Sequence, residues 1–410
     1  MKAEDWKRAY ADLIQRLPRY VRDGRVTICG LSTFVDGYVR LHEAEPLLKA
    51  REGTPPAMLA EELLRRALAG IGGEFYMDWP EGGKWVERNL VITRWGVGGT
   101  GAQAAQTLAM LGAPALMNLE DRSRRQLSVL HPDILVAFQG GVVKCGQLAI
   151  GEGEKPAHYI FEFTAGTKVQ SCVLKRSSRT IVRFSEERLD HDPDFARESV
   201  TASAEAGAGI LSGFNEMENH VLDESLKETL LLAEAWKKRG LETIHLELGD
   251  FGMVAARNKV LNLLGGVITS LGMSYSELCG FSDGSKQTIE QACELAETLN
   301  LARLCVHFDT WALSITRGDP DRELEALLCG CLLASARAEK GFPCSPVELP
   351  ADANLHALGW EKMRKSGERS IVSCAAPHLD RPAGTVGLGD TFLAGTLLVL
   401  GGAERPRANA

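Results

Sequence analysis

Thr385-Val-Gly-Leu-Gly-Asp-Thr-Phe392 runs directly into an apolar stretch, FLAGTLLVL, that has helical character and ends near Leu400. The glycines Gly387 and Gly389 let several backbone N–H groups point into one small concavity. The helix adds its unpaired first-turn amides and the positive end of its dipole. This arrangement suits the binding of a phosphoryl group that gains negative charge during transfer, and Asp390 lies beside it at the start of the helix. The alternative is that Asp390 only caps the helix and the glycines only shape the turn.

The chain on either side of this turn predicts the fold class. Downstream of Gly101, apolar helices alternate with short apolar strands, which is typical of a mostly parallel sheet with helices on both faces. In the rest of the chain, most candidate strands are short and are separated by Gly, Ser and charged residues. We therefore expect a large α/β core from residues 1–30, 98–150 and 189–410, and a small β-rich lid from two insertions, 31–97 and 151–188. The first helix, from Asp5 to Leu17, should end at Pro18, and one of the strands of the core should span Val267–Ser270.

The TVGLGDT stretch resembles the phosphate-binding turn of ribokinase-like sugar kinases, and more narrowly that of the ADP-dependent glucokinase and phosphofructokinase family. The resemblance extends as short matches from about Trp6 to the last helix. It implies a three-layer αβα core and transfer of a phosphoryl group from ADP to a sugar hydroxyl. The family's catalytic base and anion hole then correspond to Asp390 and to the amides of Gly387, Leu388 and Gly389.

Two further stretches resemble the sugar-binding side of that family. Gly98-Gly-Thr-Gly-Ala-Gln-Ala104 opens a helix and is similar to a GGxAG stretch, which implies that Gly98, Gly99 and Gln103 line the sugar site. The alternative is a plain turn into a helix. Lys175, Arg176, Arg179 and Arg183 form a basic cluster, and Arg183-Phe184 resembles the family's NRF stretch without its Asn. Guanidinium groups match phosphate oxygens, so the cluster is a candidate phosphate site or else a solvated face.

Two acidic residues complete the predicted sugar site. Asp36 keeps the last position of the family's N-x-N-x-D pattern, in which the aspartate holds sugar hydroxyls. Ser32 and Phe34 replace the two asparagines, and because a phenyl ring forms no hydrogen bond to a hydroxyl, the acceptor stays open. Glu74 resembles a glutamate that contacts the sugar in the glucokinase branch, which favours an unphosphorylated sugar, whereas the basic cluster favours a sugar phosphate. The alternative for both Asp36 and Glu74 is an ordinary solvent-exposed carboxylate without a binding role.

Two glutamates are the candidate metal residues. His245 and Glu247 lie on one side of a strand and match an HxE pattern that the family associates with magnesium through bound water. Glu277 matches the last acid of a SLGxNExE stretch. Magnesium needs few carboxylates because it keeps several waters. The alternatives are a strand-end ion pair for Glu247 and a helix N-terminal acid for Glu277. His307 ends a strand near the same edge and is a further candidate for lining the nucleotide cleft.

Composition excludes several classes of protein. The 410 residues are 45% hydrophobic and 24% charged, which is typical of a globular chain, and the net charge of −8 disfavours nucleic acid binding. No apolar run approaches the ~18 residues of a membrane span, and the charged N-terminus does not resemble a signal peptide. The ten scattered cysteines contain no CxxC pair and indicate reduced thiols in a cytoplasmic protein.

These observations together favour one function. We expect a magnesium-assisted, ADP-dependent sugar kinase that phosphorylates a hydroxyl of a hexose or hexose phosphate, either glucose or fructose 6-phosphate, as a monomer or homodimer. The choice of ADP over ATP rests on the resemblance alone. Two alternatives remain: a ribokinase-like kinase with another acceptor, such as a nucleoside or pentose derivative, or with ATP as donor; and a non-catalytic sensor that binds sugar or nucleotide.

Overall fold

The computed structural model describes residues 2–215, 217–282 and 287–402. Its largest part is an eleven-stranded sheet. In chain order the strands are β1 (Thr27–Cys29), β5 (Ala115–Met117), β6 (Leu135–Phe138), β7 (Gly141–Lys144), β12 (Ala208–Leu211), β13 (Ile244–Glu247), β14 (Ser270–Ser274), β15 (Arg303–Phe308), β16 (Trp311–Thr316), β18 (Met363–Ser366) and β19 (Arg369–Ala375). They are arranged in the order β18-β19-β16-β15-β14-β13-β12-β1-β5-β6-β7. The strands from β15 to β6 pair in parallel, which confirms the predicted fold class.

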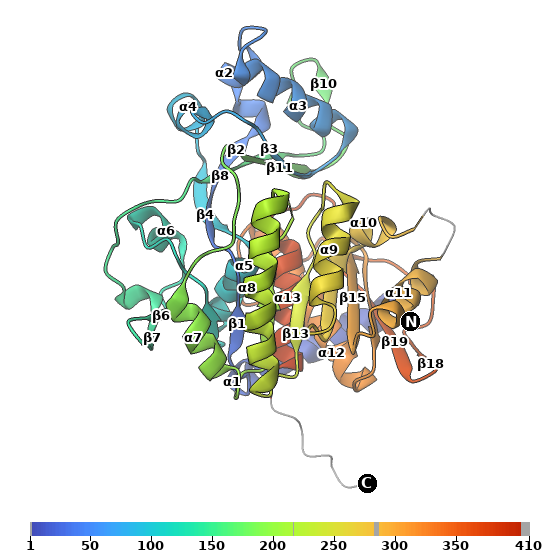
Figure 1. Cartoon of the computed structure of the whole chain (residues 1–410). Helices are drawn as coiled ribbons and strands as arrows, with labels where there is room; N and C mark the ends of the chain where they lie inside the picture. Colours follow the sequence, from blue (N-terminus) through green and yellow to red (C-terminus); the bar gives the residue numbers. More distant parts are fainter. Residues whose placement is uncertain (1, 216, 283–286, 403–410) are drawn as a thin grey trace.

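Helices cover both faces of this sheet (Figure 1). One face packs against α1 (Ala3–Arg22), α5 (Thr100–Leu111), α12 (Pro320–Lys340) and α13 (Leu388–Leu400). The other packs against α7 (Pro193–Ala202), α8 (Asn219–Lys238), α9 (Val254–Leu264), α10 (Tyr275–Cys279) and α11 (Thr288–Thr298). The short helix α6 (Arg124–Val129) contacts the strands β2 (Phe34–Arg40) and β4 (Arg94–Gly98) of a second sheet. Each face buries an extended apolar cluster, and burial of such surface is the main stabilising contribution to the fold.

Two predicted boundaries are wrong. The first helix does not end at Pro18 but continues to Arg22, because Trp6, Tyr10 and Leu17 bury one continuous face against the core. That burial outweighs the single backbone hydrogen bond that proline removes. The strand expected at 267–270 lies instead at Ser270–Ser274, and the buried Val267 and Ile268 belong to the turn before it. Apolar composition alone did not separate the turn from the strand.

A second, smaller sheet has the order β3-β11-β8-β2-β4. Its strands are β2 (Phe34–Arg40), β3 (Gly73–Tyr76), β4 (Arg94–Gly98), β8 (His158–Phe163) and β11 (Ser178–Arg183). With α2 (Glu45–Leu48), α3 (Pro55–Ala69) and α4 (Gly82–Asn89) it encloses a core of its own. Figure 1 shows this unit above the carboxyl ends of β13 and β15. The remaining strands are the hairpin β9 (Lys168–Val169) and β10 (Cys172–Val173), and the pair β17 (Asn354–Leu355) and β20 (Pro377–His378).

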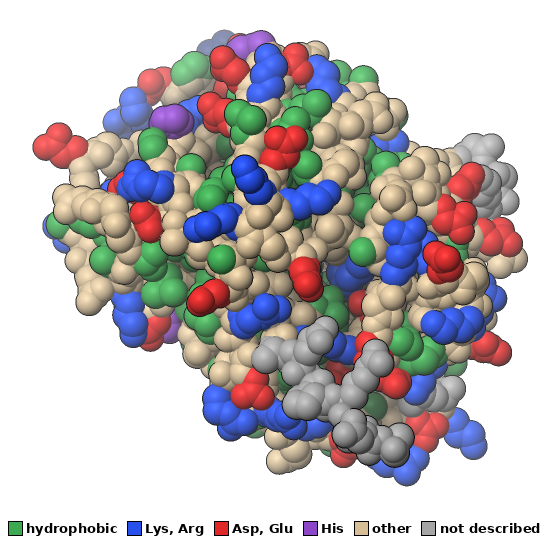
Figure 2. Space-filling view, turned by 60° about the horizontal axis from the view of Figure 1, so that its bottom comes forward, with side chains coloured by type: hydrophobic (Ala, Val, Ile, Leu, Met, Phe, Trp, Pro, Cys, Tyr) green, Lys and Arg blue, Asp and Glu red, His purple; other side chains and the backbone are tan. Residues whose placement is uncertain are grey.

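The surface carries both signs of charge. Figure 2 shows acidic and basic side chains interspersed over one face, with hydrophobic side chains scattered among them. Within the described ranges, no helix combines the length and the apolar composition that a bilayer crossing requires. Open α/β sheets bind ligands at the carboxyl ends of their parallel strands, and the smaller sheet lies above that edge.

Candidate active site

The glycine turn and the first turn of α13 form the floor of the site. Gly387 has a φ of +72° and is the residue before the helix, while Leu388, Gly389 and Asp390 form its first turn. The first amides of a helix have no partner within it, so they can bind an anion. The positive φ makes glycine the residue of choice at position 387. The glycine turn and the helix start that the sequence predicted are therefore present in the structure.

Asp390 is partly buried at the start of this helix. Burial raises the pKa of its carboxyl group, and the positive charge of Arg337 and a hydrogen bond from Thr100 oppose that rise. Glu247 adds a smaller repulsion, and Arg179 a further attraction. The carboxylate therefore lies among two arginines and a hydroxyl, which partly offset the effect of its burial.

Arg337 connects three helices at this point. The side chain is buried on α12; Nη1 donates to Oγ1 of Thr391 on α13 at 2.9 Å, and Nη2 donates to Oε1 of Gln103 on α5 at 2.8 Å. The other end of the Gln103 amide, Nε2, donates to the backbone oxygen of Val97 at 2.5 Å. Both ends of the Gln103 amide are thus engaged within the protein, and this side chain orients Arg337.

Asp36 lies on β2, opposite the glycines that begin the predicted sugar stretch. A Cβ atom on Gly98 would lie 2.2 Å from Oδ1 of Asp36, and one on Gly99, whose φ is +90°, would lie 2.3 Å from the oxygen of Ser32. Only glycine permits this close approach. Burial is the main reason that the pKa of Asp36 is raised to about 6; His158 lowers it and Asp390 raises it further. The structure thus brings Asp36 and Asp390 into one electrostatic environment.

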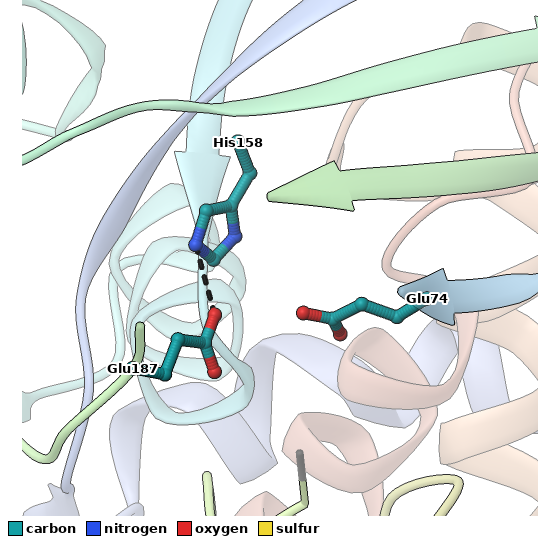
Figure 3. A group of neighbouring side chains, drawn as sticks. All are labelled: Glu74, His158 and Glu187. Atoms are coloured by element: carbon teal, nitrogen blue, oxygen red, sulfur yellow. Dashed lines mark ion pairs between the residues drawn. The ribbon is translucent and has the colours of Figure 1, made fainter. Parts of the chain in front are cut away.

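Glu74, His158 and Glu187 form a compact cluster beside Asp36 (Figure 3). Nε2 of His158 lies 2.9 Å from Oε1 of Glu187, and Nδ1 lies 4.0 Å from Oδ1 of Asp36. Nε of Arg183 lies 2.5 Å from Oε1 of Glu74 and 3.3 Å from Oε1 of Glu187. Although these groups are spaced closely enough for a metal ion, Arg183 already supplies a positive charge between the two carboxylates.

The four cations of the predicted basic cluster separate in the structure. Lys175 and Arg176 are exposed, with Nη2 of Arg176 only 3.6 Å from Oδ2 of Asp309. Arg183 is buried in the cluster described above. Arg179 lies nearest the reaction site: burial lowers its pKa, and the charge of Asp390 opposes that shift. Within the described residues, Nε of Arg179 has no hydrogen-bond partner, so it is a donor available to a ligand.

His245, Glu247 and His307 meet at the carboxyl ends of β13 and β15. Nε2 of His245 lies 2.8 Å from Oε2 of Glu247, and Nε2 of His307 lies 3.6 Å from Oε1. Burial raises the pKa of Glu247, but hydrogen bonds and charge from the two histidines outweigh it and lower the pKa to about 2. A Cβ atom on Gly389 would lie 3.1 Å from Cε1 of His307. The glycine turn and Glu247 are therefore neighbours, with His307 between them.

Glu277 lies in the first turn of α10, as expected for the alternative role of a helix N-terminal acid. Its Oε2 accepts from the backbone N–H of Ser274 at 2.6 Å, and its own N–H donates to Oγ of Ser274 at 3.3 Å, which is a capping box. Burial is the main reason that the pKa of Glu277 is raised to about 7, and the charge of Glu247 adds to the rise. The negative charge of Glu247 therefore acts on Glu277.

Four residues described above were not assigned from the sequence: Thr100, His158, Glu187 and Arg337. Arg337 carried a usable signal, since it is a lone arginine in the apolar stretch LLASARA of α12, and a buried guanidinium requires acceptors. Thr100 lies within the glycine stretch itself. Glu187 lies in the irregular segment after β11, where no periodicity indicates which way a side chain points.

Comparisons with known proteins identify the class to which this fold and site belong. The model of the "ADP-specific Phosphofructokinase/Glucokinase conserved region" matches residues 54–399. An ADP-specific phosphofructokinase from Thermococcus litoralis is 28% identical over 281 residues, covering 58% of this chain and 61% of the relative. An ADP-dependent glucose/glucosamine kinase from Pyrococcus furiosus is 24% identical, covering 94% of this chain and 96% of the relative.

Solved structures agree on the fold. An ADP-dependent kinase in complex with fructose 6-phosphate and ADPβS has a TM-score of 0.79 at 18% identity, and covers 98% of this chain and 99% of that one. A phosphofructokinase from Pyrococcus horikoshii with AMP has a TM-score of 0.70 at 20% identity, and covers 92% of this chain and 97% of that one. The fold and family define an α/β phosphotransferase with an alcohol group as acceptor. The chain belongs to the ADP-specific phosphofructokinase/glucokinase family.

Proposed function

We propose that this protein transfers the β-phosphoryl group of ADP to a hydroxyl of a hexose, with Asp390 as the general base. The observation that carries the proposal is the position of Asp390 in the first turn of α13, with Arg337 and Arg179 close enough to act on its charge. A carboxylate there accepts the hydroxyl proton, while the amides of Gly387, Leu388 and Gly389 stabilise the transferred group. Phosphoryl transfer needs this positioning and charge neutralisation more than covalent chemistry.

The two arginines supply the positive charge that the transfer requires. Arg337 is fixed by Gln103 and Thr391, so it holds its charge beside the turn without rearrangement. Arg179 comes from β11 of the smaller sheet; its Nε–H has no partner among the described residues, and its charge interacts with that of Asp390. We propose that the smaller unit, built from 31–97 and 151–188, is a lid on the core from 1–30, 98–150 and 189–410. Closing it would bring Arg179 to the phosphates and exclude water.

The carboxylates at the strand ends fit a magnesium ion. Glu247 and Glu277 offer oxygen atoms of the kind that this hard cation prefers, and few protein ligands are needed because it keeps its waters. When bound, the ion neutralises charge on the donor phosphates. Glu247 is held ionised by His245 and His307, so it is ready to receive a cation. Glu277 keeps one oxygen on the backbone of Ser274, which fixes its position.

The charges beside Asp36 favour an unphosphorylated hexose such as glucose as the acceptor. Arg183 is compensated by Glu74 and Glu187, and His158 by Glu187. The nearby Nζ of Lys155 pairs with Asp190. A phosphate group on the acceptor would have to separate one of these pairs, whereas neutral hydroxyls exchange hydrogen bonds with Asp36 and Glu74. The relative from Pyrococcus furiosus is named a glucose/glucosamine kinase, which is consistent with such an acceptor.

A coupled phosphoryl-transfer assay tests this function. ADP and ATP are each offered with glucose, glucosamine, fructose 6-phosphate, ribose or a nucleoside, in the presence of magnesium. We expect turnover with ADP and an unphosphorylated hexose, a loss of kcat on the order of 10³-fold in Asp390→Asn, and retained ADP binding. Asp380→Asn, which changes an exposed carboxylate in the loop before the turn, is the matched control. Full activity in Asp390→Asn, or no ADP binding by the wild type, would exclude this mechanism.

A further inference from the structure

A chain of buried polar side chains runs from α12 to Glu247. Oε1 of Glu323 accepts from Nε of Arg303 at 2.8 Å, and Nη1 of Arg303 lies 3.4 Å from Oγ of Ser270. Oγ of Ser270 lies 2.8 Å from Nδ1 of His245, whose Nε2 lies 2.8 Å from Glu247. The first four members of this relay (Glu323, Arg303, Ser270 and His245) are buried. Such a line of polar groups in an otherwise apolar core is costly unless every link is made.

The sheet register explains how these residues meet. His245, Ser270 and Arg303 are direct partners across β13, β14 and β15, so their side chains form one row on the face that packs against α12 and α13. Gly272, two residues after Ser270, has no side chain in the next row. A Cβ atom there would lie 1.9 Å from Oε2 of Glu247, so the carboxylate occupies the space that glycine leaves. The backbone thus fixes both the relay and its end point.

The direction of each hydrogen bond follows from the groups at the two ends of the relay. The guanidinium of Arg303 only donates, so Oγ of Ser270 accepts from it. The carboxylate of Glu247 only accepts, so Nε2 of His245 donates to it, and Oγ of Ser270 donates to Nδ1 of the ring. A neutral imidazole that accepts at Nδ1 carries its proton at Nε2 and donates there to Oε2 of Glu247. Oε1 of Glu247 is then the oxygen directed toward His307 and the glycine turn.

We propose that Arg303 and Ser270 are positioning residues that fix the Nε2–H tautomer of His245, and thereby present one oxygen of Glu247 to the nucleotide-bound magnesium. Neither residue touches the reacting atoms. Outer hydrogen-bond partners of this kind orient metal-binding groups and tune affinity. The magnesium part of this inference rests on the proposed function. The tautomer part concerns the protein without ligands and is independent of that function.

Nitrogen NMR of the ligand-free protein tests the tautomer directly. The protein is labelled with ¹⁵N only in its nine histidines, and His245→Gln identifies the signals of this ring. In the wild type we expect a protonated Nε2 and an unprotonated Nδ1 at neutral pH. In Ser270→Ala, Nδ1 loses its donor, so the two nitrogen shifts should converge toward a mixture of tautomers. Ser314→Ala is the matched control, because Ser314 is a fully buried serine on neighbouring β16 that lies outside the relay.

Magnesium dependence is the second readout. We expect the half-saturating magnesium concentration to rise about tenfold in Ser270→Ala, with the acceptor KM unchanged, and to stay at the wild-type value in Ser314→Ala. Ser270→Thr keeps the hydroxyl and should restore both readouts. Should Ser270→Ala not fold, Ser270→Cys preserves the volume with a weaker donor and is expected to change both readouts in the same direction.

The outcomes separate the two proposals. An unchanged Nε2–H signal in Ser270→Ala, or equal magnesium dependence in Ser270→Ala and Ser314→Ala, overturns the positioning role. If Asp390→Asn keeps full activity, the proposed function fails, while the NMR signals still decide whether Ser270 fixes the ring. A tautomer change together with a selective loss of magnesium affinity supports the inference as a whole.

Discussion

The guanidinium of Arg337 packs directly against Gly387, so closely that a Cβ atom on this glycine would lie 2.3 Å from Nη2. The glycine is required here for two reasons, its φ of +72° and the space that Arg337 occupies. Since the same guanidinium also binds Gln103 and Thr391, it cannot move aside without breaking both hydrogen bonds. A fixed positive charge therefore lies under the turn in the absence of any ligand.

Removal of that charge should shift the pH dependence of catalysis. The positive charge of Arg337 opposes the rise that burial causes in the pKa of Asp390, so in Arg337→Met this pKa should rise further. A base works only when ionised, so kcat/KM is present above the pKa of Asp390 and is lost as pH falls through it. We expect the acid limb of the pH profile to move upward and the rate on that limb to fall about tenfold. Arg337→Lys, which keeps the charge, should retain most of the wild-type profile; an unshifted limb in Arg337→Met would contradict this role.

Gly272 should tolerate no side chain. A methyl group there would displace Oε2 of Glu247 and press on the ring of His245, since a Cβ atom would come within 1.9 Å and 2.7 Å of them. We expect Gly272→Ala to raise the half-saturating magnesium concentration tenfold or more and to lower the melting temperature. The comparison is Gly266→Ala, because no atom lies within 4 Å of a Cβ at Gly266. Similar magnesium dependence in the two variants would show that Glu247 does not need this space.

Asp36 should destabilise the ligand-free protein at neutral pH. Burial raises the pKa of its carboxyl group from 3.8 to about 6, so the folded protein holds a proton that the unfolded chain releases between these values. Stability is therefore lost as pH rises from about 4 to about 6 and levels off above that range. Asp36→Asn should be more stable than the wild type at pH 7, by at most about 3 kcal/mol, and nearly equal at pH 4. Denaturant unfolding at both pH values measures this, together with the expected rise in acceptor KM.

Glu74 should contribute to acceptor choice through the charge beside Arg183. In Glu74→Gln the buried guanidinium of Arg183 keeps its ion pair with Glu187 but loses the negative charge of residue 74. We expect the ratio of kcat/KM for fructose 6-phosphate to that for glucose to rise about tenfold, equivalent to about 1.4 kcal/mol. Glu87→Gln removes a carboxylate from another ion pair of the smaller unit, with Arg125, and should leave the ratio unchanged. An equal change in both variants would rule out a specific role for Glu74.

The sequence predicted the parts of this structure that depend on local pattern. The alternation of helices and strands indicated the parallel sheet, and the glycines around Asp390 indicated the turn, because backbone freedom and strand–helix order are properties of neighbouring residues. The same reasoning failed at Pro18, where tertiary burial of Leu17 outweighs the local effect of proline. It also placed one strand too early, since Val267 and Ile268 are apolar but lie in a turn.

The partners of the site residues could not be predicted in the same way. Gln103 and Arg337 are far apart in sequence and meet only because α5 and α12 both pack beside α13. The basic cluster separated because Arg179 and Arg183 lie on a strand with neighbours of different charge, whereas Lys175 and Arg176 precede that strand on the surface. Sequence reveals that a group is charged, but its counter-charge depends on the tertiary packing. The catalytic, sugar and metal roles of these residues therefore stay predictions.

The pairing of β2 with β8 has a consequence for how the protein is made. Asp36 is the register partner of His158, yet the segment between them builds α5, α6 and β5 to β7 of the large unit. Such pairing is non-local, and closing a long loop slows folding. On the ribosome, β2 and β4 emerge well before β8 and β11, and the edge of β2 that pairs with β8 in the finished sheet stays open until β8 arrives. The smaller sheet, and with it the surroundings of Asp36, is therefore completed only after synthesis has passed β11.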